Sequence, residues 1–283
     1  MGGLKISIKL INFIELFPET SISLQMKRIH AFEFEDLSWF PKNLRNYTTD
    51  FLQFGANTFD MYRSAIPILK KGIEHAGNNT ILDIASGGGG GLIRIAQHLK
   101  KENPSIKIIL SDFYPNIEAF ERTRAHAPET FEFMKEPVDA MHVPTSLKGL
   151  RTQFLSFHHF KPEQAKAILQ NAIDNRQPIA IFEVQQRNVK SMIPMLLSPL
   201  NLFLTTPFIR PFKIDRILFT YLIPILPLFI LWDGVISVLR TYTVQELNTM
   251  IIQLNGYDQF TWEVGITKGK PVSVGYLLGI PRK

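Results

Sequence analysis

Two adjacent histidines and one glutamate are the side chains best suited to moving a proton. His158 and His159 lie in the stretch SFHHF, and Glu183 interrupts the apolar run IAIFEV. Because an imidazole titrates at about pH 6.5, either histidine can serve as a general base near neutral pH. A carboxylate among apolar residues usually has a partner or a role. We predict catalytic roles for these three residues; the alternative is that one histidine caps the next helix and the other packs.

The same side chains raise the question of a metal ion. The chain has no cysteine, which excludes thiolate metal sites, thiol nucleophiles and disulfides. His158 and His159 would need a third ligand, for which Glu183 is a candidate. Nothing in the sequence fixes that geometry, and we therefore predict no metal site.

A run of five glycines, Gly87–Gly91, follows the stretch DIAS. Glycines at such a turn let a ligand approach the backbone without meeting a Cβ atom. A dinucleotide-binding fingerprint would need its third glycine where Leu92 stands, and a P-loop would need lysine and then serine or threonine where Leu92 and Ile93 follow. Both phosphate-binding motifs are therefore disfavoured, and with them an NAD-dependent oxidoreductase.

The elements that must position these residues alternate from Thr80 onward. Apolar runs predict strands at 80–84, 106–110, 131–136, 152–157, 178–184, 260–266 and 273–280, and amphipathic stretches predict helices at 92–101, 116–127, 162–175 and 243–254. Such alternation is typical of an α/β fold, a doubly wound and mostly parallel seven-stranded sheet whose final hairpin is antiparallel. Ligands bind such sheets beyond the carboxyl ends of the strands. We divide the chain into an N-terminal helical segment (1–75) and a main domain (76–283) that contains an apolar insertion (188–240).

The acidic residue and glycines after the first predicted strand resemble the first motif of class I S-adenosylmethionine-dependent methyltransferases. Asp83, Gly87 and Gly89 match that motif, and Ala85 replaces its first glycine. The resemblance covers residues 80–183 and agrees with the final two strands. It implies a Rossmann-like methyltransferase fold and S-adenosyl-L-methionine as the cofactor.

Two further acids match positions of this family. The family places an acid at the end of the second strand to hold the ribose hydroxyls, where Asp112 stands in LSDFYPN, and an acid or amide near the adenine, where Asp139 stands in PVDAM. The alternatives are a helix cap for Asp112 and an ordinary loop acid for Asp139. The implied cofactor-binding residues are Asp83, Ala85, Ser86, Gly87, Gly89, Asp112, Phe113, Asp139, Ala140 and Phe157.

The family also places acceptor-side residues after the fourth strand, where His158 and His159 lie. Further candidates for substrate contact are Tyr114, which would bracket the adenine or pack; Trp232 and Asp233, which would close a lid; and Arg240, which would pair with Glu183 or bind an acidic acceptor. The stretches SDFYPN, RTQFLSFHHF, IFEVQQR and LWDGVISVLRTY resemble a bacterial group of methyltransferase-like proteins with an apolar segment in the second half. That resemblance supplies no substrate.

Two uncharged apolar runs, 191–209 and 217–232, lie in the insertion. We expect Pro194, Pro199 and Pro207 to break the first run, and the basic residues Arg210, Lys213 and Arg216 to form a tip between the two. A broken apolar hairpin with a basic tip predicts peripheral membrane contact through 191–232. A buried lid and true spanning helices are the alternatives. For residues 1–17 we predict an amphipathic helix rather than a signal peptide or a myristoylation site.

These observations predict methyl transfer to an apolar small-molecule or lipid-like acceptor by a cytoplasmic protein, peripheral at the inner membrane face. The alternatives are a non-catalytic membrane-associated scaffold or cofactor sensor, and a nucleic-acid methyltransferase. The net charge of +6 permits nucleic-acid binding, but the basic residues are scattered, so we expect no nucleic-acid partner. The acceptor, the atom methylated and the oligomeric state stay open.

Overall fold

The computed structural model describes residues 26–282 of the chain. The amphipathic helix expected within residues 1–17 lies outside the described residues. The strands are β1 (Thr80–Ile84), β2 (Lys107–Ser111), β3 (Phe131–Phe133), β4 (Leu150–Phe154), β5 (Ile179–Glu183), β6 (Phe260–Ile266) and β7 (Gly275–Pro281). The helices are α1 (Lys42–Thr58), α2 (Ile66–Glu74), α3 (Leu92–Leu99), α4 (Ile117–His126), α5 (Pro162–Asp174), α6 (Val189–Leu196), α7 (Ser198–Thr205), α8 (Ile214–Ile217), α9 (Ile225–Arg240) and α10 (Val244–Ile251).

The strands form one seven-stranded sheet in the order β3-β2-β1-β4-β5-β7-β6. The first five strands pair in parallel, whereas β7 is antiparallel to both β5 and β6. The predicted α/β fold, mostly parallel with an antiparallel edge, is confirmed. Because the strand order reverses between β1 and β4, the carboxyl ends of β1, β2 and β4 meet where such sheets bind ligands.

Apolar side chains on the two faces of the sheet pack against different helices. On one face, Ile81 of β1 belongs to a buried cluster with residues of α2, α3 and α4. On the other, the next residue, Leu82, belongs to a cluster with residues of α5 and α10. This alternation is what a strand covered on both sides requires, and it explains why the strands read as continuous apolar runs.

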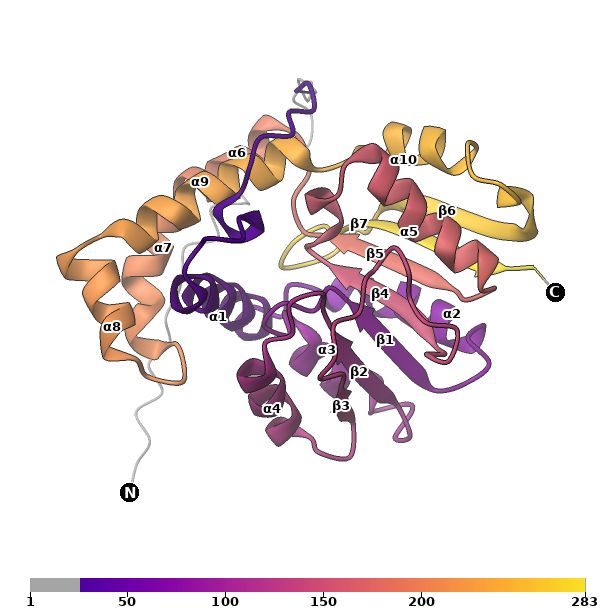
Figure 1. The fold of residues 1–283 in the computed structure, drawn as a ribbon, viewed down its shortest axis with the longest axis horizontal. Coiled ribbons are helices and arrows are strands. Elements are labelled where there is room, and N and C mark those ends of the chain that lie inside the picture. The colour runs from indigo at the N-terminus through magenta and orange to yellow at the C-terminus, as the bar shows by residue number, and fades with distance from the viewer. Residues whose placement is uncertain (1–25, 283) are drawn as a thin grey trace.

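A third cluster joins α1 to the insertion. Phe40, Leu44 and Tyr47 pack against Leu202 of α7 and against Leu226 and Ile230 of α9. In Figure 1 the helices α6 to α9 extend to one side of the sheet, and α1 lies between them and the sheet. We call α6 to α9, residues 189–240, the arm. The N-terminal helical segment and the insertion thus share a core.

The arm differs from the expectation in its first run. Val189–Phe208 is a single helical stretch of 20 residues, long and apolar enough to cross a membrane, with 22% of its apolar window buried. Pro199 lies in the first turn of α7, where a helix does not need its N–H, and Pro194 is accommodated inside α6. Of the three prolines expected to break this run, Pro194 lies inside α6 without ending it, whereas Pro199 and Pro207 stand in the first turns of α7 and of the short 3-10 helix η5 (Thr206–Phe208), where one helical element ends and the next begins. The second run is bent by 80° between residues 222 and 225, at Pro224.

Two other expectations need correction. The strand predicted over 152–157 is β4, which ends at Phe154 because Leu155 adopts a left-handed backbone conformation with φ of 54°. His158 and His159 then lie in a short 3-10 helix, η4 (Phe157–His159). Arg216 does not contribute to a basic tip, because its side chain is buried against Asp50 of α1, with Nη1 3.0 Å from Oδ2.

Candidate functional site

The glycine loop begins with a sharp turn at the carboxyl end of β1. The backbone N–H groups of Ala85 and Ser86 both donate to the carbonyl oxygen of Ser111, which ends β2. Ala85 has a φ of 76°, which a residue with a Cβ rarely adopts, and Gly87 and Gly89 have φ values of 54° and 93°. The glycine that the family has at position 85 would relieve this turn of its strain.

Only part of the glycine loop is open to a ligand. A Cβ at Gly91 would lie 2.5 Å from the ring of Tyr62, and one at Gly89 would lie 2.9 Å from Thr123. A Cβ at Gly88 would also crowd Thr49 of α1. A Cβ at Gly87 or at Gly90 would meet no described atom within 4 Å apart from the adjoining residues of the chain. A ligand can therefore reach the loop at Gly87, while three of the other glycines serve packing.

Asp112 stands beside this opening. Its carboxylate accepts hydrogen bonds from the backbone N–H groups of Gly87 and Tyr114, each at 2.8 Å. Burial raises the pKa of Asp112, although these N–H groups act in the opposite direction. The following helix is capped by Asn116, whose side chain accepts from the N–H of Ala119. Asp112 thus lies at the strand end that the resemblance assigns to the ribose.

The other residues predicted for the cofactor lie around the same edge of the sheet. Asp139 accepts from the N–H of Met141 at 2.9 Å and contacts His142 at 2.8 Å. Phe113 and Tyr114 are exposed neighbours in edge-to-face contact, and Ser86 and Ala140 are buried. Phe157 is buried in the same apolar cluster as Ala140, and its ring contacts that of Tyr242.

Asp83 is a buried carboxyl below the loop. It is 2% exposed and accepts a hydrogen bond from Thr152 of β4 at 2.7 Å. Burial raises its pKa from 3.8 to about 7. The side chain supports the loop from inside, while Asp112 faces the opening.

The predicted catalytic residues His158 and Glu183 form a hydrogen-bonded pair. Both the Nδ1 atom and the backbone N–H of His158 lie 3.1 Å from the Glu183 carboxylate. The Nε2 atom of His158 faces Glu33, with 3.7 Å between it and Oε1. The side chain of His158 is 1% exposed. This is the arrangement of a carboxylate that orients an imidazole.

His159 has carboxylate neighbours of its own. Its Nδ1 atom lies 2.7 Å from Asp36, and its Nε2 atom lies 3.8 Å from Oε2 of Glu33. Burial alone lowers the pKa of His159, but Glu33 and Asp36 outweigh it and raise the pKa to about 9. The two predicted histidines are therefore together, and both face one glutamate.

Arg240 does not pair with Glu183, which corrects that expectation. Its guanidinium lies 2.9 Å from Glu33 and 2.6 Å from Asp36, and it donates to the carbonyl oxygen of His159. A buried arginine so placed neutralises part of the negative charge of the cluster.

Trp232 and Asp233 hold the N-terminal segment rather than a lid. The indole of Trp232 donates to the carbonyl oxygen of Phe32, and Asp233 accepts from the N–H of Phe34 at 2.7 Å. These contacts hold residues 26–36 against α9, and Figure 1 shows the segment running beside this helix. The segment brings Glu33 to the histidines.

Sequence reasoning missed Glu33 and Asp36. Both lie in the stretch HAFEFED, in which acids are interleaved with aromatic residues. That interleaving was a usable signal, since acids among aromatics are seldom left without a partner. It could not indicate which partner, because the histidines follow far along the chain.

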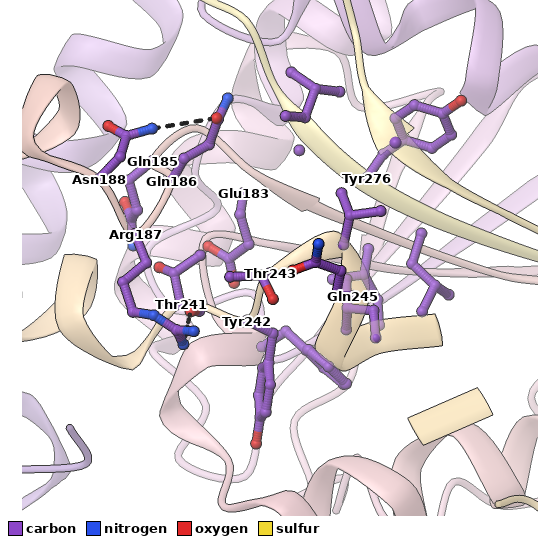
Figure 2. Close-up of a pocket in the computed structure, with 18 residues that line it drawn as sticks. Glu183, Gln185, Gln186, Arg187, Asn188, Thr241, Tyr242, Thr243, Gln245 and Tyr276 are labelled. Atoms are coloured by element: carbon purple, nitrogen blue, oxygen red, sulfur yellow. Dashed lines mark hydrogen bonds between the residues drawn. The ribbon is translucent and has the colours of Figure 1, made fainter. Parts of the chain in front are cut away.

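A cavity of about 360 Å³ lies beside the His158–Glu183 pair, and residues of β5, β6, β7 and α10 line it. Its lining includes apolar residues such as Phe157, Ile181 and Leu277, together with Glu183 and Thr243. Figure 2 shows Glu183, Thr241 and Thr243 gathered around one part of it. Arg187 borders the cavity and makes a two-point ion pair with Glu246. The cavity therefore adjoins the His158–Glu183 pair, not the glycine loop.

Comparison with solved structures finds the same architecture in other proteins. A candidate Zn-dependent alcohol dehydrogenase from Rhodobacter sphaeroides is 10% identical, with 86% of this chain and 100% of that chain covered at a TM-score of 0.50. The O-methyltransferase NcsB1 of neocarzinostatin biosynthesis, solved with S-adenosylmethionine and 2-hydroxy-5-methyl naphthoic acid, is 11% identical, with 83% and 57% covered at 0.48. Human N-acetylserotonin methyltransferase, solved with S-adenosylmethionine, is 13% identical, with 83% and 57% covered at 0.46.

At these identities the likeness concerns the fold alone. The chain spans 57% of the length of the two methyltransferases. No protein-family model matches the sequence, and no curated protein matches it. The strand order, with β7 antiparallel between β5 and β6, is that of the class I methyltransferase fold. The chain has this fold.

Proposed function

We propose that the protein transfers a methyl group from S-adenosylmethionine to an apolar small-molecule or lipid-like acceptor. The observation that carries this proposal is the opening at Gly87, which lies beside the carboxylate of Asp112 at the ends of two adjacent strands. A carboxylate can accept both hydrogen bonds of a vicinal diol, which is the chemistry that a ribose presents. Asp139 would receive the adenine amino group.

In such a transfer the protein mainly has to align the acceptor atom with the methyl carbon and the sulfur atom. Held at Gly87 and Asp112, S-adenosylmethionine would supply an activated methyl group for in-line transfer, and its sulfonium would become the neutral thioether of S-adenosylhomocysteine. An acceptor hydroxyl or amine must also lose its proton. We assign that proton to Glu183, because it lines the cavity and already orients His158.

We propose the cavity beside Glu183 as the acceptor site. The side chains of Phe157, Ile181 and Leu277 give it apolar walls, and Glu183 and Thr243 supply polar atoms at its edge. Pockets for small molecules combine these features. The exposed apolar residues of the arm support a membrane-derived acceptor and a location at the inner membrane face.

Calorimetric titration of the full chain with S-adenosylmethionine tests the proposal. We expect micromolar binding that Asp112→Ala abolishes, because the alanine cannot accept the ribose hydroxyls. Asp258→Ala is the matched control: it removes an acid from the short 3-10 helix η7 (Tyr257–Gln259), far along the chain from the glycine loop, and should bind as wild type.

Wild-type protein that does not bind the cofactor would contradict the proposal and favour the scaffold alternative. Cofactor binding followed by transfer of the methyl label into RNA, with binding that weakens steeply as salt is added, would instead favour the nucleic-acid alternative. Transfer of the label into a lipid-soluble extract is the result that we expect.

A further inference from the structure

We infer that Glu33, His158 and His159 bind a divalent transition-metal ion. Their ligand atoms all lie within 4.8 Å of one another. This inference goes beyond the proposed methyl transfer and does not depend on it. It also departs from the sequence-based prediction of no metal, because the third ligand is Glu33 and not Glu183.

Both imidazoles are oriented as metal ligands usually are. The Nδ1 atom of His158 lies 3.1 Å from Glu183, and that of His159 lies 2.7 Å from Asp36. A carboxylate on one ring nitrogen fixes the tautomer and leaves the other nitrogen free to coordinate. Here both free Nε2 atoms face the same carboxylate, that of Glu33.

One of the three ligand atoms, Nε2 of His158, lacks a hydrogen-bond partner in the described part of the chain, on a side chain that is 1% exposed. The carboxylate of Glu33 is already partnered: Oε1 lies 2.9 Å from Nη1 of Arg240, and Oε2 accepts a hydrogen bond from Ser237 at 3.0 Å. Buried polar atoms without a partner are uncommon and costly, so Nε2 of His158 calls for an explanation. A bound ion would give this nitrogen a partner.

The separations suit coordination better than hydrogen bonding. The Nε2 atoms of the two histidines lie 3.7 and 3.8 Å from Glu33 oxygens, which is too far for a hydrogen bond. Metal–ligand bonds of about 2.0–2.2 Å place two ligands of a tetrahedral ion roughly 3.4 Å apart. These two distances go to different oxygens of Glu33, and the three ligand atoms all lie within 4.8 Å of one another, so coordination of one ion would draw them together by up to about 1.4 Å.

The charges of the cluster leave room for a dication. Glu33, Asp36 and Glu183 carry three negative charges, and Arg240, which lies 2.9 Å from Glu33 and 2.6 Å from Asp36, carries one positive charge. Because His159 has a raised pKa of about 9, an ion would have to displace its proton; the cluster is then doubly negative, which a divalent ion balances. Arg240 would share Glu33 with the ion, and its repulsion should moderate the affinity.

The donor set selects the class of metal. Two imidazoles and one carboxylate suit Zn²⁺, Fe²⁺ or Co²⁺, whereas Mg²⁺ and Ca²⁺ prefer oxygen ligands. The ligands also come from two separate parts of the chain, the 26–36 segment and η4. A bound ion would therefore fasten this segment to the sheet, in addition to leaving a coordination position for a water or a substrate oxygen.

Metal titration of the chelator-treated full chain tests the inference. Co²⁺ should bind one to one with visible absorption bands of low coordination number, and Zn²⁺ should displace it, whereas Mg²⁺ should not. Zn²⁺ should also slow amide hydrogen exchange in residues 26–36. Glu33→Gln and His158→Asn should each weaken binding by roughly tenfold or more, as the loss of one ligand implies.

Glu35→Gln is the matched control, because Glu35 lies in the same segment, but its carboxylate accepts from Thr48 and supplies none of the three clustered ligand atoms. It should bind Co²⁺ as wild type. His159→Asn is a further ligand variant if Glu33→Gln fails to fold, as judged by circular dichroism. An absent Co²⁺ spectrum in wild type, or equal losses in Glu35→Gln and the ligand variants, would overturn the inference and leave the cluster as a network of ion pairs.

Discussion

Burial strongly changes the pKa of one carboxyl group near the glycine loop, that of Asp83. It sits under the glycine loop, where Thr152 donates one hydrogen bond to its carboxyl group and the charged neighbour acting on it is another acid, Asp112. Removing a carboxylate from water disfavours its charged form, which is why burial raises its pKa from 3.8 to about 7. Asp233 of α9 has a pKa raised to about 7 for the same leading reason.

The raised pKa of Asp83 predicts a stability that falls as the pH rises. Between about pH 4 and pH 7 the folded protein holds a proton that the unfolded chain has released, so the free energy of unfolding decreases with pH in this window. Asp83→Asn should flatten this dependence by up to about 1.4 kcal/mol per pH unit. Asp233 should keep a remaining slope of the same sign.

Urea unfolding at several pH values measures this effect. Asp174→Asn serves as the control, since Asp174 is exposed and its carboxylate accepts a hydrogen bond from Gln170. An unchanged slope in Asp83→Asn would show that Asp83 stays ionised throughout.

At the scale of elements, the arm presents a continuous apolar stripe. Leu196, Leu200, Leu204 and Phe208 are spaced four residues apart, and each is about half exposed, between 47% and 57%. Residues at this spacing share one helix face. On α9, Leu228 and Trp232 are also exposed at the same spacing. A face of this kind is costly in water and suits the boundary between lipid headgroups and acyl chains.

Replacing the centre of this stripe should release the protein from membranes. We expect wild type to float with phosphatidylcholine vesicles that contain phosphatidylglycerol, because Arg210 is exposed beside the stripe. The double variant Leu200→Lys, Leu204→Lys should bind at least about tenfold more weakly, since each buried leucine contributes roughly 1.5–3 kcal/mol. Ile252→Lys, which changes an exposed apolar residue outside the arm, should float as wild type. Equal flotation of all three proteins would refute membrane contact through the stripe.

The elements differ in how much of them could be predicted. The strands β1, β2 and β5 were predictable because burial on both faces forces apolar runs of the right length, and Thr243 with Glu246 marked the start of α10 through a capping box that the structure contains. The 26–36 segment was not predictable, because its course depends on contacts with Trp232 and Asp233 of α9 rather than on its own periodicity. The position of Glu33, the third ligand of the proposed metal site, could therefore not be predicted from the sequence.

At the scale of the whole molecule, the buried carboxylate of Asp50 connects α1 with the arm and with α4. Asp50 of α1 lies 3.0 Å from Arg216 of the arm and 2.8 Å from Arg122 of α4, which packs on the sheet. The side chains of Asp50 and Arg216 are both 1% exposed. The apolar cluster around Tyr47 joins the same helix to α7 and α9. The N-terminal helix and the arm should therefore unfold together with the sheet.

Asp50→Asn tests this coupling, because it removes the charge while keeping the shape. It leaves the buried guanidinium of Arg216 with neutral acceptors alone, namely the carbonyl oxygens of Ile209 and Pro211 and the new amide oxygen, and the loss of one partner of a buried ion pair costs about 3–5 kcal/mol. We expect the urea midpoints from circular dichroism, which follows the helices and sheet, and from fluorescence, which includes Trp232 of α9, to fall by the same amount. Asp258→Asn, which changes an exposed acid of η7, should leave both midpoints unchanged. If the fluorescence transition moved alone, α1 and the arm would unfold independently of the sheet, and Asp50 would stabilise only its own part of the molecule.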